Sequence, residues 1–326
     1  MTYEGARQAL AAPRRWQTME FAFWLAILAA YALLPERSLL LNETAILGLF
    51  ALSLDLVLGI AGIVSLGHAA FFGLGAYTAG LIGKLGLTEP ILGLLIAGLA
   101  AGALGFATSF LVLRGSDLTR LMVTLSVSLV MLELANRLTT LTGGADGLQG
   151  IVIGAVLGTF EFDMFGRVAA AYSLIILFLL FLLARWLVNA PFGLAVQAIA
   201  SNPLRSAAIG IPITRRLIAI YSIAAAIAGI AGALLAQTTQ FVSLDVLAFH
   251  RSAEVMLVLV IGGTGYLYGG LVGAVLFKLL QDQLSDLTPQ YWQFWLGLIF
   301  VALVVIGRER VFGFPQAVWR RIRGGV

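Results

Sequence analysis

Long apolar runs alternate with short polar stretches along the whole chain, as is typical of helices that cross a lipid bilayer. A helix needs about 20 mostly apolar residues to cross the bilayer. The pattern predicts about eight spans and one apolar region, 254–281, that glycines divide into two short halves. This region is either two short tilted spans or a re-entrant pair, so we expect about 8–10 spans. The eight full spans cover 18–34, 43–60, 67–84, 90–113, 121–138, 168–188, 217–237 and 291–306.

Composition agrees with this pattern. Of the 326 residues, 60% are hydrophobic and 11% are charged, whereas a soluble domain carries about 25% charged residues. We therefore expect an all-α polytopic membrane protein with a single transmembrane domain at 18–306. A segment at 1–17 and a basic tail at 307–326 flank this domain. The absence of cysteine excludes disulfides and cysteine metal sites, and we expect no metal, cofactor or nucleic acid.

The distribution of charge predicts which loops lie in the cytoplasm. Basic residues gather in 1–17, 114–120, 189–216 and 307–326, and most acidic residues gather in the other loops. Because basic loops stay inside, both termini are expected in the cytoplasm, with 139–167 as an external loop. A basic flank before 18–34 also resembles a signal peptide. We expect this first helix to remain uncleaved, because many further spans follow it.

The stretch 59–80, GIAGIVSLGHAAFFGLGAYTAG, is too rich in glycine for an ordinary helix and too apolar for a surface loop. Irregular backbone at membrane depth is tolerated only where protein or a water-filled cavity satisfies its polar groups. We therefore predict a helix break near 62–67 that faces the protein interior or a pathway. The glycines also suit close helix packing, and both interpretations stay open. The pathway candidates are Ser65, Gly67 and His68 at the break and Asp55 before it.

Charged residues inside the spans are further candidates. An isolated charge at the bilayer centre costs about 2.5–3.5 kcal/mol on insertion scales, so Asp55 is either a pathway residue or a hydrogen-bonded carboxyl between helices. Glu133 has Arg137 four residues later, and Lys278 has Asp282 at the same spacing. Such pairs are neighbours on a helix, so we interpret both as structural. The chain contains no glycine-rich motif of the kind that precedes a phosphate-binding lysine, so we expect no ATP hydrolysis by this chain.

The cytoplasmic stretch 189–216 predicts a short, doubly capped helix. Asn202 is a good N-cap and Pro203 suits the first helical position. Gly210 suits the residue after the helix, and Pro212 prevents continuation. A helix this short is marginal alone, so its apolar face needs a surface to pack on. A groove on a partner protein and the bilayer surface both fit this requirement. The apolar face consists of Leu204, Ala207, Ala208 and Ile211.

Four segments together resemble one family of membrane proteins. Stretch 59–80 is similar to the signature of the membrane subunits of branched-chain amino acid ABC importers, the LivH/LivM permeases. The resemblance extends over roughly 43–307 and is closest to the larger, LivM-like subunit. The other three segments, in the same order, are the external loop TGGADGL at 142–148, the cytoplasmic loop at 191–211 and the hairpin IGGTGYLYGG at 261–270.

This resemblance implies a permease in a bacterial or archaeal plasma membrane that does not itself catalyse a reaction. The expected partners are a second, LivH-like permease, two cytoplasmic ATPases and an external binding protein. The resemblance also places the short cytoplasmic helix against an ATPase. The coupling residues are then Asn202, Pro203, Leu204, Arg205, Ala207, Ala208 and Gly210.

Departures from the family pattern keep alternatives open. Relatives usually carry arginines where this chain has Gln197 and Ala200, a glutamine in place of Ile63, and an amide in place of Asp55. The last two differences leave urea or a short amide as an alternative solute to branched-chain amino acids. A self-contained secondary transporter or channel is a further alternative, because glycine-broken helices also suit a site at the bilayer midplane. An autonomous transporter would have no need of the capped cytoplasmic helix.

Overall fold

The structure is a computed structural model that describes residues 18–306 except 157 and 164. The predicted cytoplasmic segment 1–17 and basic tail 307–326 lie outside the described residues. Within the described part the chain is helical, and it contains two isolated β-bridges but no sheet. The all-α prediction is therefore confirmed for this part of the chain.

The helices follow the predicted order closely. The longer helices are α2 (Thr18–Leu33), α3 (Ser38–Asp55), α4 (Ala69–Lys84), α5 (Pro90–Val112), α6 (Asp117–Arg137), α8 (Arg167–Asn189), α9 (Pro191–Ser201), α11 (Ile213–Thr239), α12 (Phe249–Gly262), α13 (Leu267–Leu287) and α14 (Trp292–Ile306). The short elements are η2 (Pro35–Arg37), the π-turn η3 (Leu56–Ile60), α7 (Thr139–Thr142), η4 (Gly144–Asp146), α10 (Pro203–Ala208) and η5 (Leu244–Leu247).

Five of the described helices are long and apolar enough to cross a membrane, and a sixth span results if one bent pair is counted. Continuous helix at 35–60 is the first of the five, and α5, α6, α8 and α11 are the others. The bent pair is α12 and α13, which meet at an angle of 110°. This bend falls at the glycines that divide the predicted region 254–281.

Proline begins several helices, because its fixed φ and missing N–H suit the first helical position. Pro90, Pro191 and Pro203 begin α5, α9 and α10 in this way. Asn189 does not cap α9. Ala190 is the N-cap, and the Asn189 amide turns back to donate to the Arg185 carbonyl at 2.8 Å, within the last turn of α8.

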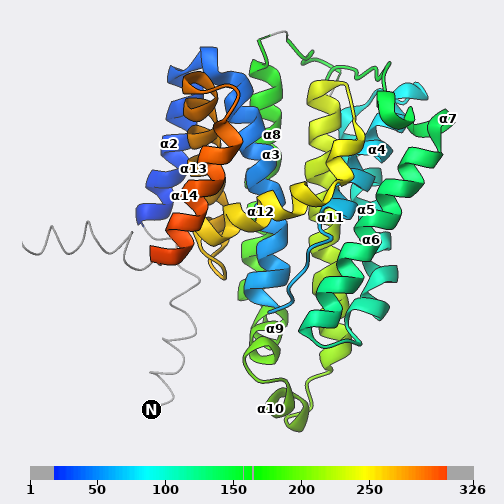
Figure 1. Cartoon of the computed structure of the whole chain (residues 1–326), viewed down its shortest axis with the longest axis vertical. Helices are drawn as coiled ribbons and strands as arrows, with labels where there is room; N and C mark the ends of the chain where they lie inside the picture. Colours follow the sequence, from blue (N-terminus) through cyan, green and yellow to red (C-terminus); the bar gives the residue numbers. More distant parts are fainter. Residues whose placement is uncertain (1–17, 157, 164, 307–326) are drawn as a thin grey trace, which may run out of the picture.

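The helices form one bundle with two different ends (Figure 1). α3 and α11 are largely buried, with α2, α13 and α14 on one side and α4, α5 and α6 on the other. α12 runs across the bundle instead of along it. α9 and α10 project at one end, and the connection between α7 and α8 covers the opposite end. The two predicted polar loops therefore lie at opposite ends of the molecule.

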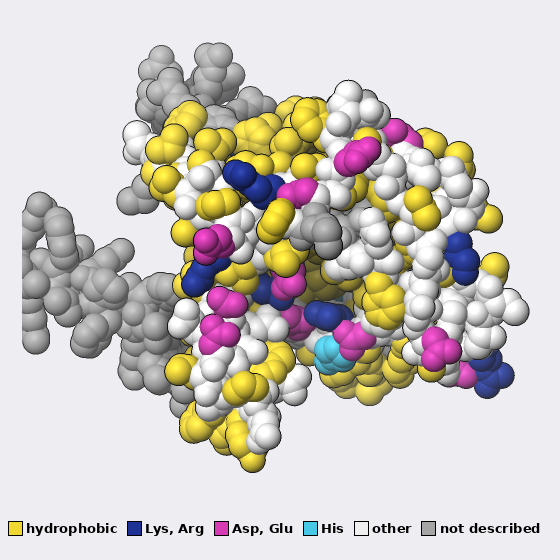
Figure 2. All heavy atoms as spheres, turned by 90° about the horizontal axis from the view of Figure 1, so that it is seen from above, with side chains coloured by type: hydrophobic (Ala, Val, Ile, Leu, Met, Phe, Trp, Pro, Cys, Tyr) yellow, Lys and Arg dark blue, Asp and Glu magenta, His cyan; other side chains and the backbone are white. Residues whose placement is uncertain are grey.

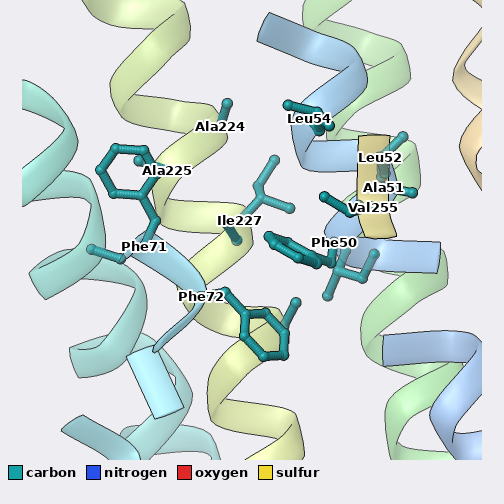
Figure 3. Close-up of a cluster of buried hydrophobic side chains, with 14 of the residues drawn as sticks. Phe50, Ala51, Leu52, Leu54, Phe71, Phe72, Ala224, Ala225, Ile227 and Val255 are labelled. Carbon is teal, nitrogen blue, oxygen red and sulfur yellow. The ribbon is translucent and has the colours of Figure 1, made fainter. Parts of the chain in front are cut away.

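The core is formed where α3, α4, α11 and α12 meet (Figure 3). The rings of Phe50 and Phe72 face each other across α3 and α4, with centroids 4.6 Å apart. Between α4 and α11, a Cβ added at Gly75 would overlap the backbone of Gly229. The two helices can approach this closely because Gly75 has no side chain at the contact. Close packing therefore explains part of the glycine content of 59–80.

Candidate functional site

The predicted break lies between α3 and α4. The last turn of α3 widens into the π-turn η3, Gly62 takes a left-handed φ of 69°, and residues 63–68 run without regular structure to the start of α4. A π-turn of this kind is frequent at functional sites. Ser65 and His68 are almost fully buried at this break. The irregular segment therefore faces the protein interior, as the glycine pattern predicts.

Gly67 allows this irregular segment to pack closely against the backbone of α6. A Cβ at Gly67 would overlap the carbonyl group of Thr124, so only glycine fits without a shift of the backbone. The neighbouring amide of Leu66 donates to the Thr124 hydroxyl at 3.1 Å. On the other side, the amide of Ala69 donates to the Ser252 hydroxyl of α12 at 2.9 Å. Two hydroxyl side chains thus supply partners for the broken backbone, and neither was among the predicted site residues.

His68 is held between α3 and α4 by one hydrogen bond and two rings. Its Nε2 lies 2.9 Å from the Ser53 hydroxyl, which itself donates to the Phe50 carbonyl at 2.6 Å. Because the single hydroxyl hydrogen is used in that bond, His68 must donate through Nε2, and this assigns its tautomer. The imidazole stacks on Phe50 at 5.6 Å and meets the edge of Phe71. Its Nδ1 has no hydrogen-bond partner among the described residues.

Ser65 lies on the other face of the break, close to α11. Its hydroxyl is buried beside that of Tyr221 but makes no regular hydrogen bond to a described residue. Tyr221 also reaches Thr108 on α5. Ser65, Gly67 and His68 thus occupy one irregular segment but contact three different neighbours, namely α11, α6 and α3.

Asp55 is hydrogen-bonded to the second broken region, which is the bend between α12 and α13. Its side chain is fully buried, and its Oδ1 accepts the Gly265 amide at 2.7 Å. Gly265 has a left-handed φ of 80° and lies against Gly59, where an added Cβ would overlap the Gly265 backbone. Oδ2 has no hydrogen-bond partner among the described residues. Asp55 therefore ties α3 to the bend, and the structure does not bring it together with Ser65 and His68 as one site.

A cavity of about 320 Å³ lies among α3, α4, α11, α12 and α13. None of the four pathway candidates lines it. Two of its lining residues connect it to the break, because Phe50 stacks on His68 and Phe72 packs against Phe50. Figure 2 looks onto the end of the bundle opposite α10, and it shows acidic and basic side chains gathered around a hollow. The lining residues are Leu39, Asn42, Glu43, Ile46, Leu47, Phe50, Phe72, Leu235, Thr238, Thr239, Arg251, Glu254, Lys278 and Gln281.

Ion pairs in and beside this cavity join α3 with α13 and η5 with α12, and one further pair lies within α12. Lys278 donates to Glu43 at 2.8 Å, and Arg251 contacts both Glu254 at 3.0 Å and Asp245 at 2.9 Å. The predicted pair between Lys278 and Asp282 is therefore wrong, because α3 offers Lys278 a carboxylate across the cavity. Asp282 lies instead 3.5 Å from Arg37. The exposed pair of Glu133 and Arg137 on α6 is confirmed at 2.6 Å.

The short helix α10 has both of its predicted caps. The Asn202 side chain accepts the Arg205 amide at 2.9 Å, and Pro203 occupies the first turn. After the helix, Gly210 takes a φ of 84°. Ser206 is buried against the rest of the protein, whereas Ala207 and Ala208 are exposed. In the described protein the predicted apolar face is therefore mostly open, and 85% of Leu204 is exposed.

α9 connects this short helix to the break. It packs on α8, α10 and α11 and also contacts the π-turn η3. A Cβ placed on Gly62 would lie 3.4 Å from the Ala200 side chain, so the break and the end of α9 are neighbours. Gly193, Val196 and Ile199 form the buried face of α9. A displacement of α10 therefore has a short packed route to the irregular segment.

These features define a class of protein: a helical membrane bundle whose interior contains broken helices and a charged cavity, with a capped helix exposed at one end. The chain belongs to the family described as branched-chain amino acid transport system permease component, whose model matches residues 37–306. This match includes every described helix from α3 onward. It therefore covers the break between α3 and α4, the bend between α12 and α13, the cavity and α10.

The chain is similar to three curated transport proteins. Two are high-affinity branched-chain amino acid transport system permease proteins LivM, from Salmonella typhimurium and Escherichia coli, each 30% identical over 287 residues and 80% of this chain. The chain spans 66% of the length of these two relatives. The third is the ribose import permease protein RbsC of Bacillus subtilis, 27% identical over 83% of this chain and 84% of its own length. No solved structure matches the chain.

Proposed function

We propose that this chain is a membrane-spanning permease subunit of an ABC importer for branched-chain amino acids. It forms the solute pathway with a second permease, receives solute from an external binding protein, and is driven by two cytoplasmic ATPases in trans. Membership in the permease family supports this role. The observation that carries the coupling to ATPases is α10, a doubly capped helix whose small apolar side chains are open at one end of the bundle.

In this proposal α10 docks in a groove of an ATPase and moves with it. The route inward runs from α10 to α9 and then to η3, because these elements pack on one another in that order. The π-turn and the irregular segment after it interrupt the regular α-helical structure of the bundle. Ser65, Gly67 and His68 then support the pathway at the break, and Asp55 supports it at the bend between α12 and α13.

The proposed topology places both termini and α10 in the cytoplasm. Besides the long helices, α2 and α4 have 16 residues and α14 has 15, which is enough to span if the local bilayer thins or neighbouring helices cover the ends. Adding them to the five long helices gives eight spans, and the bent pair raises the number to as many as ten. The proposed membrane is a bacterial or archaeal plasma membrane, with 139–167 outside and 189–216 inside.

Reconstitution with the proposed partners tests the function. The chain is produced with its second permease, the two ATPases and the binding protein, and uptake of radiolabelled leucine, urea and ribose is measured in proteoliposomes. We expect ATP-dependent uptake of leucine only, and copurification of the ATPases after mild solubilisation. Uptake of urea would favour the urea and short-amide alternative. Leucine uptake by the chain alone, without ATPases, would favour a self-contained transporter.

A further inference from the structure

The cavity among α3, α4, α11, α12 and α13 combines charges of both signs with an apolar wall. Its ionisable lining residues are Glu43, Glu254, Arg251 and Lys278, so the two anions balance the two cations. Charged side chains at membrane depth are costly, and where they occur they mark solute or ion pathways. A volume of about 320 Å³ lies within the range of sites for small molecules.

Two of these charges retain bonding capacity after their ion pairs are counted. The Lys278 ammonium has three donor hydrogens, and it donates to Glu43 Oε2 at 2.8 Å. Glu254 accepts from Arg251 through Oε2 at 3.0 Å, which leaves its other oxygen available to a further donor. Their side chains are only 13% and 17% exposed, respectively. Arg251 differs from them, because it is held between Asp245 and Glu254.

The uncharged part of the cavity lining has polar groups from Asn42, Thr238, Thr239 and Gln281, and an apolar wall. Ile46 and Leu47 of α3 and Leu235 of α11 line it, together with the facing rings of Phe50 and Phe72. Phe50 is stacked on His68, which Ser53 holds by a hydrogen bond. The aromatic part of the wall is thus fixed from behind by the break between α3 and α4.

We propose that this cavity binds an amino acid as its zwitterion. The Lys278 ammonium receives the carboxylate of the solute, Glu254 receives its ammonium group, and an aliphatic side chain packs on Phe50 and Phe72. A site with balanced charges fits a zwitterion better than a sugar, which carries no charge for these groups to meet. The proposal rests on the proposed function as an amino-acid permease and adds a solute site within this one subunit.

Binding of solute analogues to the wild-type complex tests the charge requirement. The complex of both permeases and both ATPases is placed in nanodiscs without the binding protein, and its melting temperature is measured with each probe. A ligand that binds the folded state raises this temperature. We expect a rise with L-leucine. We expect none with leucinamide, which lacks the carboxylate, with 4-methylpentanoate, which lacks the ammonium group, or with ribose. Equal shifts with all four probes, or none with leucine, would overturn the proposal.

Variants then locate the site. Lys278→Gln and Glu254→Gln are each expected to raise the dissociation constant of leucine by about tenfold or more, because each removes one charged hydrogen-bond partner. Lys278→Arg should retain binding. Arg137→Gln is the matched control, since it breaks an exposed ion pair on α6 whose residues do not line the cavity. Copurification of the ATPases shows which variants assemble. If Lys278→Gln assembles and binds leucine normally, the proposal is wrong.

A charge exchange separates solute binding from a structural role. The double variant Glu43→Lys with Lys278→Glu retains an ion pair across the cavity but reverses the positions of its charges. If Lys278 binds the carboxylate, the double variant should bind leucine as weakly as Lys278→Gln does. Leucine affinity equal to that of the wild type would assign the pair a structural role only. Different results would contradict the solute site in the cavity and the proposed function as an amino-acid permease. Leucine uptake by the complete system without any leucine binding to the complex would overturn this inference alone, whereas absence of leucine uptake would overturn the proposed function.

Discussion

At the scale of single residues, hydroxyl side chains replace the main-chain partners that the broken segment loses. The amide of Leu66 finds the Thr124 hydroxyl, and that of Ala69 finds the Ser252 hydroxyl. An unsatisfied amide costs several kcal/mol in hydrocarbon, so such bonds allow an irregular segment at membrane depth. Serine and threonine hydroxyls also bond to carbonyls of their own helices. Sequence alone therefore does not indicate that Thr124 and Ser252 are partners of the broken segment.

Substitution of Gly67 should disturb the break. Gly67→Leu places a bulky side chain against the Thr124 backbone, so we expect uptake by the reconstituted complex to be lost and its melting temperature to fall. Gly297→Leu is a suitable control, because no atom of the described residues lies within 4 Å of a Cβ added there in α14. If the two variants transport leucine equally well, then Gly67 is not a close contact of α6.

Asp55 allows a sharper test, because its two functions can be separated. Asp55→Asn keeps an oxygen that accepts the Gly265 amide, whereas Asp55→Ala leaves that amide without its partner. We expect Asp55→Ala to lower stability by about 1–3 kcal/mol, the cost of a buried unsatisfied donor, and Asp55→Asn to retain most of it. Thermal unfolding of the purified complex measures both. Loss of uptake in Asp55→Asn with unchanged stability would show that the charge itself acts in the pathway.

At the scale of elements, α10 and α9 form a unit with an inner and an outer surface. The inner surface is Ser206 of α10 together with the buried face of α9, which reaches η3. The outer surface consists of the exposed residues between the two caps of α10, among them Leu204, Ala207 and Ala208. Caps make so short a helix rigid, so a force on the outer surface moves the whole unit.

Enlarging Ala208 should affect partner binding and little else. Ala208 is exposed in this chain, so Ala208→Trp should leave membrane insertion intact, yet it should clash in a partner groove by about 1–3 kcal/mol. We expect less ATPase copurification and weaker solute-stimulated ATP hydrolysis. Gln149→Trp, at the opposite end of the bundle, is the control. Normal coupling in Ala208→Trp would mean that α10 lies on the membrane surface instead.

At the scale of the whole molecule, the bundle has one end with α9 and α10 and another with the charged hollow (Figures 1 and 2). Basic residues of 189–216 belong to the first end, and acidic residues of the connection between α7 and α8 belong to the second. The proposed orientation puts the first end in the cytoplasm. The cavity with Lys278 and Glu254 then opens toward the side from which a binding protein would deliver solute.

Cysteine labelling tests this orientation. The chain has no cysteine of its own, so a single cysteine at Asp146 or Arg205 reports without background. In intact cells an impermeant thiol reagent should label the cysteine at Asp146 but not the one at Arg205, and lysis should make both reactive. A cysteine at Arg320, which lies outside the described residues, should behave like that at Arg205. External labelling at Arg205 would reverse the topology.

The sequence by itself determined the features that depend on neighbours along the chain. Apolar runs of span length, the break near 62–67, the divided region 254–281 and the two caps of α10 all arise from residues within a few turns of one another. Helix ends were placed less well, because hydropathy follows the lipid-facing run and α11 continues beyond it at both ends.

Only the tertiary structure decided which distant groups meet. Lys278 pairs with Glu43 at a separation of 235 residues, instead of with the nearby Asp282, and Asp55 meets Gly265 at a separation of 210. A buried charge bonds to whatever partner helix packing places within reach, and the spacing of residues along one helix does not specify that packing. For the same reason the charged cavity, to which five separate helices contribute, had no signature in the sequence.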